Sequence, residues 1–109
     1  MMGSIQVVEF HGRLTFGQAS ESRYAELRDH INSGDRHIIL DLGRVSDVDS
    51  AGLGFLVMCF TSVRRAGGEL RLAAPSPRVV HALSLTRLDT VFPVFPTTED
   101  ARREWPAGY

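Results

Sequence analysis

The sequence predicts a single α/β domain in which a small β-sheet packs against α-helices. Short apolar segments typical of strands alternate along the chain with segments whose apolar residues recur at helical spacing. Strands joined through helices favour parallel pairing, because each crossover returns the chain to the same end of the sheet. The 109 residues suffice for one hydrophobic core and are too few for two.

The first part of the chain predicts two strands separated by a helix. Residues 5–10 combine alternation with an apolar pair, as in a strand, and Gly12 ends this strand before a short extended piece at residues 13–16. Apolar residues at helical spacing predict a helix over residues 19–33. A continuous apolar run then predicts a buried central strand at residues 37–42.

Residues 53–66 predict a second long helix, whose faces can be assigned on a wheel of 100° per residue. One stripe is expected to face the sheet and consists of Leu53, Leu56, Val57, Phe60 and Val63. Phe55, Met58 and Ser62 fall on the opposite side, close to Ser50. Phe55 and Met58 either pack under neighbouring helices or loops, or form an apolar contact surface for a partner, and the spacing leaves both open.

The last third of the chain predicts two short strands and two short helices. A clean alternation predicts a strand at residues 69–73, and Ser76 is expected to cap a following helix that carries Val80 inward. Residues 91–95 predict a last strand, which its proline confines to an edge or a bulge. Thr98 is expected to cap a short C-terminal helix with acidic residues in its first turn.

Asp49 and Ser50 lie at the junction between the predicted central strand and the second long helix. Asp and Ser are preferred there because their side-chain oxygens accept hydrogen bonds from unpaired helix N–H groups. Gly52 and Gly54 each cost roughly 1 kcal/mol relative to alanine in a helix, but they leave the backbone around Ser50 open. A helix N-terminus also favours a phosphate electrostatically. Locally, Ser50 therefore fits either a helix cap or a modified serine.

The order of three segments makes the second interpretation stronger. Residues 38–42 (IILDL), 48–54 (VDSAGLG) and 65–70 (RAGGEL) together resemble the STAS domains of bacterial anti-sigma-factor antagonists. The resemblance covers about residues 4–101, and it implies one STAS domain over residues 1–109 with a small mixed β-sheet packed against α-helices. In that family, the serine that follows the aspartate of a D-S-x-G motif is phosphorylated by a partner kinase, and this serine corresponds to Ser50.

By the same resemblance, the implied function is partner switching in the regulation of transcription. The unphosphorylated chain would bind an anti-sigma factor that has a histidine-kinase-like ATPase fold, and so release the sigma factor. Phosphorylation of Ser50 by that kinase would end the interaction, and a serine phosphatase would restore it. The residues assigned to the partner contact are Thr15, Asp49, Ser50, Ala51, Gly52, Gly54, Phe55 and Met58.

The sequence departs from the family pattern at two places. Family members carry an acidic residue that assists the kinase at the position of Thr15, so phosphorylation of Ser50 is expected to be slow or to depend on another acid such as Asp49. The family also has one more strand at the start of the domain, and residues 1–4 are too few to form it.

Composition and missing motifs exclude several other classes of protein. A net charge of −1, from 12 basic and 13 acidic residues, argues against direct binding of nucleic acid. No apolar run approaches the roughly 20 residues of a membrane-spanning helix, and the single Cys59 fits a reducing compartment, so a cytoplasmic protein is expected.

No cofactor, metal site or enzymatic activity is predicted either. The four histidines are scattered, Val57 stands where a dinucleotide-binding motif needs its third glycine, and Ser50 is not in a G-x-S-x-G elbow. Two alternative functions remain open: a STAS scaffold subunit that does not switch, in a sensory assembly or a lipid-transport complex, and a STAS module that binds a small ligand or nucleotide.

Overall fold

The computed structural model describes residues 5–103 and 105. Its elements follow in the order β1 (Ile5–Leu14), α1 (Gln18–Asn32), β2 (His37–Val48), α2 (Ser50–Arg65), β3 (Glu69–Ala73), α3 (Pro77–Leu85), a 3₁₀ helix (Leu88–Thr90), β4 (Val94–Phe95) and α4 (Thr98–Arg102). The extra N-terminal strand of the family concerns residues 1–4, which lie outside the described residues.

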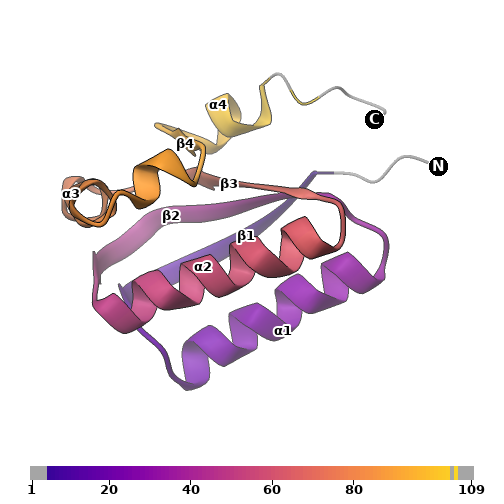
Figure 1. The fold of residues 1–109 in the computed structure, drawn as a ribbon, viewed down its shortest axis with the longest axis horizontal. Helices are drawn as coiled ribbons and strands as arrows, with labels where there is room; N and C mark the ends of the chain where they lie inside the picture. The colour runs from indigo at the N-terminus through magenta and orange to yellow at the C-terminus, as the bar shows by residue number, and fades with distance from the viewer. Residues whose placement is uncertain (1–4, 104, 106–109) are drawn as a thin grey trace.

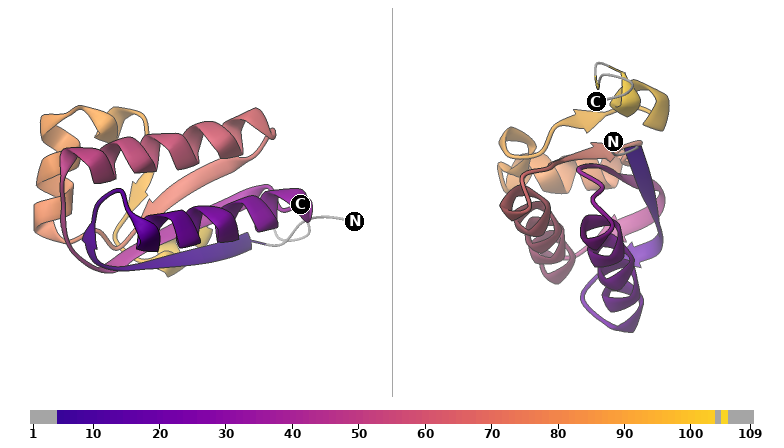
Figure 2. Two further views of the ribbon diagram at one scale, coloured as in Figure 1. Left: turned by 90° about the horizontal axis from the view of Figure 1, so that it is seen from below. Right: turned by 90° about the vertical axis from the view of Figure 1, so that its right-hand side faces the viewer.

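The described strands form one sheet in the order β1-β2-β3-β4, which confirms the predicted α/β class. All three strand pairs are parallel, so the mixed pairing expected from the family is not found among the described strands. The reason is that a helical crossover precedes each next strand and returns the chain to the same end of the sheet. Helices α1 and α2 lie side by side on one face of the sheet, α4 lies on the other face, and α3 lies at one end (Figures 1 and 2).

Each face of the sheet has its own apolar cluster. The larger cluster lies under α1 and α2 and includes Val8, Leu40 and Leu72, each fully buried. The smaller cluster joins Ile39 and Ala73 of the sheet to Ala101 of α4 and to Trp105. Alternate residues of the strands therefore enter different clusters, which explains why β2 is apolar on both sides.

The two strand ends predicted in the N-terminal half, at Gly12 and after residue 42, lie within longer strands. Strand β1 continues through Gly12, whose φ of 71° falls in the left-handed region, and its register with β2 shifts at this point. Strand β2 continues beyond Leu42 to Val48, because Val45 and Val48 keep contributing buried side chains. The segment between the predicted strand at residues 37–42 and the D-S-x-G motif is thus part of the sheet.

The predicted buried stripe of α2 is confirmed at Leu53, Leu56 and Val63, but the buried face as a whole is rotated by roughly 60° from the predicted one on a wheel of 100° per residue. Phe55 is only 1% exposed and Cys59 is buried, whereas Val57 is 37% exposed and Phe60 is half-buried. The helix packs against α1 as well as the sheet, and its buried face is the average of these two directions. The Tyr24 hydroxyl of α1, for example, is hydrogen-bonded to Ser62 at 2.7 Å.

In the C-terminal part, β3 and the Ser76 cap of α3 are confirmed, and three details are wrong. Val79 rather than Val80 points inward, since Val80 is 45% exposed. Strand β4 contains only Val94 and Phe95 rather than residues 91–95, although its predicted position at the edge of the sheet is confirmed. The cap of α4 is Thr97 rather than Thr98, and its hydroxyl accepts the N–H of Asp100.

Candidate functional site

The candidate site is the turn from β2 into α2, at the carboxyl end of the sheet. Asp49 is the N-cap of α2, in extended conformation, and its Oδ1 accepts the N–H of Gly52 at 2.7 Å. Ser50 is the first residue of the helix and is exposed. Its hydroxyl makes no hydrogen bond to any residue that the structure describes. The cap and the serine are therefore separate residues, and the interpretation of Ser50 as the cap is wrong.

The second carboxylate oxygen of Asp49 connects this turn to the end of β1. The Thr15 hydroxyl donates to Asp49 Oδ2 at 2.6 Å, and Arg13 Nη2 lies 3.8 Å from the same oxygen. The Asp49 N–H also donates to the carbonyl of Leu14 at 3.3 Å. The Thr15 hydrogen bond, followed by the Gly52 N–H, lowers the pKa of Asp49, and the charge of Arg13 adds to this effect. The carboxylate beside Ser50 is thus kept ionised.

The two glycines of the motif have different roles. A Cβ atom on Gly52 would lie 2.1 Å from the carbonyl oxygen of Leu14, so this glycine lets α2 approach the end of β1. The idea that Gly52 leaves room for a kinase is therefore wrong, because this residue is buried. A Cβ atom on Gly54 would meet nothing within 4 Å, and Gly54, like Ala51, is exposed. The exposed side of the first turn of α2 thus carries small residues around Ser50.

The apolar residues expected beside Ser50 differ in exposure. The expectation of an outward-facing Phe55 is wrong, because its ring packs among those of Phe10, Phe16 and Tyr24 with centroids 5.8 to 6.3 Å away. Met58 is half-buried against the main core. Phe55 therefore belongs to the alternative in which these side chains pack under a neighbouring helix.

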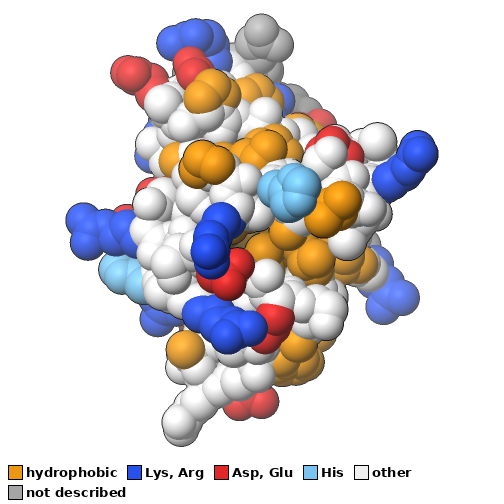
Figure 3. Space-filling model, turned by 90° about the vertical axis from the view of Figure 1, so that its left-hand side faces the viewer, with side chains coloured by type: hydrophobic (Ala, Val, Ile, Leu, Met, Phe, Trp, Pro, Cys, Tyr) orange, Lys and Arg blue, Asp and Glu red, His pale blue; other side chains and the backbone are white. Residues whose placement is uncertain are grey.

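Three residues near the motif were missed by sequence reasoning. Arg13 and Arg78 each lie within 4 Å of a carboxylate of the motif segment, Asp49 and Asp47 respectively, and Phe16 is 54% exposed. Seen from this end, acidic and basic side chains lie next to one another in the middle of the face, with apolar side chains beside them (Figure 3). The β1–β2 register places Arg13 opposite Asp47, which brings the end of β1 beside the motif segment, and this pairing could not be read from local sequence signals.

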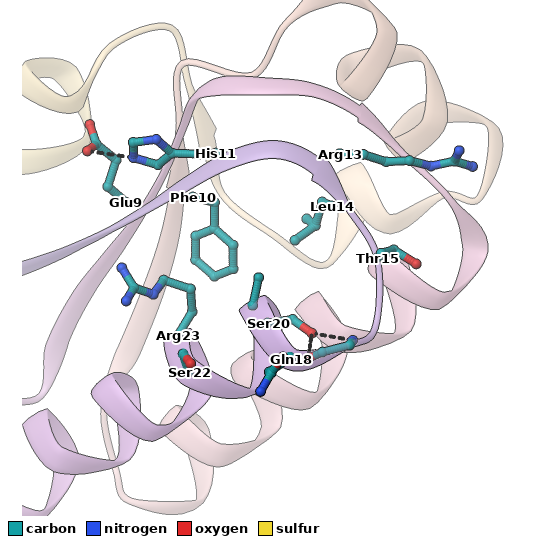
Figure 4. A pocket seen from close by; sticks show the side chains of 12 residues that line it. Glu9, Phe10, His11, Arg13, Leu14, Thr15, Gln18, Ser20, Ser22 and Arg23 are labelled. Carbon is teal, nitrogen blue, oxygen red and sulfur yellow. Dashed lines mark hydrogen bonds and ion pairs between the residues drawn. The ribbon is translucent and has the colours of Figure 1, made fainter.

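A pocket of about 480 Å³ extends from Thr15 along β1 and the first turns of α1. Phe10 and Leu14 point into the space between strand and helix (Figure 4). The Ser20 hydroxyl both accepts the N–H of Gly17 and donates to its carbonyl, which fixes the turn between β1 and α1. The pocket thus leads to the residue that contacts Asp49.

The described residues show no sign of a metal site, a reactive thiol or a membrane-spanning helix. No cluster of three or more metal-ligating side chains occurs in residues 5–103 and 105. Burial raises the pKa of the Cys59 thiol to about 12, so Cys59 is a small buried apolar residue. Within the same residues, no helix has the length and apolar character needed to cross a bilayer.

Known proteins resemble this chain over most of its length and not only at the motif. The family model described as STAS domain matches residues 2–101. The chain belongs to the STAS family.

Among its relatives is the "Putative anti-sigma factor antagonist BtrV" of Bordetella bronchiseptica, which is 33% identical over 82 residues, or 75% of this chain and 71% of that protein. The "Putative anti-sigma factor antagonist TM1081 homolog" of Thermotoga neapolitana is 36% identical over 74 residues, which span 68% of this chain and 66% of that protein. The crystal structure of Thermotoga maritima TM1081 superposes on this chain with a TM-score of 0.77 and a sequence identity of 30%, and the match covers 90% of this chain and 86% of TM1081. The structure of SpoIIAA of Bacillus in its phosphorylated form has a TM-score of 0.67 and a sequence identity of 26%, and the match covers 87% of this chain and 85% of SpoIIAA.

Proposed function

We propose that this chain is a cytoplasmic anti-sigma-factor antagonist controlled by phosphorylation of Ser50. The unphosphorylated form binds an anti-sigma factor with a histidine-kinase-like ATPase fold, and the sigma factor is released. The kinase activity of that partner phosphorylates Ser50 and ends the interaction, and a serine phosphatase restores it. The chain acts by binding and supplies no catalytic residue. The observation that carries this proposal is the exposed Ser50 hydroxyl, free of hydrogen bonds to described residues, directly after the Asp49 cap.

The surroundings of Ser50 support access by a kinase. A nucleophilic hydroxyl that makes no internal hydrogen bond needs no rearrangement before it reacts. Ala51 and Gly54 are exposed and small, so the backbone of a partner can approach the first turn of α2. The partial positive charge at the N-terminal end of α2 also favours a phosphate on Ser50.

The charges around Ser50 explain how phosphorylation would weaken partner binding. A phosphate adds about −1.5 to −2 charges at pH 7. It would stand beside the ionised Asp49, whose carboxylate is already engaged by Thr15, Gly52 and Arg13. A partner that contacts the small residues of this turn would then have to desolvate two adjacent negative groups. Desolvation of unpaired charge is costly, so the modified form should bind less tightly.

The proposed contact surface consists of exposed or half-buried residues at the same end of the sheet. From the residues assigned by sequence it keeps Thr15, Asp49, Ser50, Ala51, Gly54 and Met58. Phe16 replaces Phe55 as the exposed aromatic residue. Apolar and aromatic side chains at the centre of an interface contribute most of its affinity, so Phe16 is the expected anchor.

The proposal is tested by incubating the chain with ATP and anti-sigma factors of this type from the same organism, followed by peptide mass spectrometry. Phosphate is expected on Ser50 in the wild type and in Ser46→Ala, a nearby exposed serine that serves as the control, and is expected to be absent in Ser50→Ala. Phosphate on another residue, or none on Ser50, refutes the switch. Partner binding without any phosphate transfer would instead support the scaffold alternative.

A further inference from the structure

Arg13 lies at the end of β1 with its hydrogen-bonding capacity unused. Its side chain is 63% exposed and extends away from Phe10 and Leu14 (Figure 4). Its Nη2 lies 3.8 Å from Asp49 Oδ2, which is an ion pair but longer than a hydrogen bond. The guanidinium forms no hydrogen bond to any residue among 5–103 and 105. Its five N–H donors are therefore open to another acceptor.

Asp49 does not depend on Arg13 for its hydrogen bonds. The Thr15 hydroxyl donates to Oδ2 at 2.6 Å, and the N–H of Gly52 donates to Oδ1 at 2.7 Å. The pKa of Asp49 is lowered first by the Thr15 hydrogen bond and next by that of Gly52, and the charge of Arg13 contributes less than either. Both carboxylate oxygens would thus keep a donor if the guanidinium turned to another anion. An exposed ion pair of this length is weak, so the exchange costs little.

A phosphate on Ser50 would lie within reach of the same guanidinium. Ser50 directly follows Asp49, and neighbouring Cα atoms are only about 3.8 Å apart. The phosphate would carry about −1.5 to −2 charges at pH 7, so at equal distance it attracts Arg13 up to about twice as strongly as a carboxylate does. The planar guanidinium also matches two phosphate oxygens at once. Arg13 should therefore prefer the phosphate to Asp49.

We propose that Arg13 recognises the phosphorylated state of Ser50, by exchanging the carboxylate of Asp49 for the phosphate. This inference, which rests on the proposed function, identifies the residue of this chain that binds the modification. Arg78 also lies near the motif, but its carboxylate partner is Asp47, three residues before Ser50. Through Arg13, the modification of Ser50 changes the charge pairing at the end of β1 as well as at the start of α2.

The test uses the full chain with phosphoserine incorporated at position 50 during translation, so that no kinase is needed. The pH titration of its ³¹P NMR signal follows the second ionisation of the phosphate, whose pKa is about 6 in the absence of partners. A paired arginine favours the ionised form, so Arg13→Gln should raise the titration midpoint by about 0.5 pH unit, the size expected for one exposed ion pair. Arg13→Lys should raise it less, because lysine keeps the charge and loses only the two-pronged geometry.

Arg44→Gln is the matched control. Arg44 is 71% exposed on β2, and its Nε lies 4.0 Å from a carboxylate oxygen of Glu9. The control therefore removes the same charge and a similar exposed ion pair without affecting Asp49. Because salt screens exposed charges that are not in contact, it should change the midpoint by less than about 0.2 pH unit. The ¹⁵N NMR spectrum of each variant shows whether it is folded.

Either of two results would overturn this inference. One is an unchanged midpoint in both Arg13 variants, and the other is an equal rise in Arg13→Gln and Arg44→Gln. Because the phosphate is introduced without a kinase, both results are independent of whether a partner phosphorylates Ser50. Failure of the kinase assay would instead refute the proposed function and leave the measured Arg13 pairing unchanged.

Discussion

Gly52 and Gly54 lie two residues apart in the first turns of α2, and alanine should have opposite effects at the two positions. At Gly52 the new Cβ would lie 2.1 Å from the Leu14 oxygen and 2.9 Å from Val48 Cγ2, whereas ordinary contacts begin at 3.4 Å. The end of β1 would have to move by more than about 1 Å, and overpacking of this kind costs about 1–3 kcal/mol. Weakening the hydrogen bond from Asp49 N–H to Leu14 costs about 0.5–1.5 kcal/mol more. The better helix propensity of alanine returns about 1 kcal/mol, so Gly52→Ala should destabilise the fold by roughly 0.5–3.5 kcal/mol.

A Cβ atom on Gly54 would have no neighbour within 4 Å, so only the better helix propensity of alanine affects the stability of this variant. Gly54→Ala should therefore stabilise the fold by about 0.5–1 kcal/mol. Urea unfolding followed by circular dichroism measures both free energies, and an unchanged m-value shows that the same surface is exposed on unfolding. If both variants shift the midpoint in the same direction, the close approach of α2 to the end of β1 is not as described.

Three further predictions concern the core, the cap and the thiol. Phe55→Ala should lower the free energy of urea unfolding by about 3–5 kcal/mol, and Val57→Ala by less than about 1 kcal/mol. A loss below about 1 kcal/mol for Phe55→Ala would support the orientation of α2 predicted from the sequence, in which Phe55 faces away from the sheet. The pKa of Asp49 is lowered from 3.8 in the folded state, so its contribution to stability is complete above that value and is lost as the pH falls through the lower folded pKa. Below about pH 4, the unfolding free energy of Asp49→Asn should thus depend less on pH than that of the wild type. Thr15→Val should raise the pKa of Asp49 measured by NMR, and Thr15→Ser should not. An unchanged Asp49 pKa in Thr15→Val would show that the Thr15 hydrogen bond is absent. Cys59 should react with a thiol reagent at pH 8 only when the chain unfolds, and rapid labelling of the native protein would contradict its burial.

Local sequence signals predicted the parts of the fold that depend on neighbouring residues. The apolar run at residues 37–42, the alternation at 69–73 and the Ser76–Pro77 helix start all correspond to elements of the structure. Each of these signals acts within a few residues, through side-chain alternation or through a cap that fixes the first turn.

Features that depend on a distant segment could not be read in this way. The orientation of α2 depends on α1, which places Tyr24 against Phe55, and the need for Gly52 depends on the carbonyl of Leu14. The Asp49 cap was visible as a residue type at a junction, but its contacts with Thr15 and Arg13 require the end of β1 to lie beside it. Tertiary packing, which sequence periodicity does not encode, decides all of these.

In the proposed switch, phosphate on Ser50 controls partner binding. Calorimetric titration of the cognate anti-sigma factor compares the unphosphorylated chain, the chain phosphorylated on Ser50, and Ser50→Ala after the same treatment with kinase and ATP. The unphosphorylated chain and Ser50→Ala should bind with equal affinity, and the phosphorylated chain should bind roughly 5- to 150-fold more weakly, which corresponds to about 1–3 kcal/mol. Equal affinity of the phosphorylated and unphosphorylated chains would contradict the switch and leave Ser50 as the exposed first residue of α2.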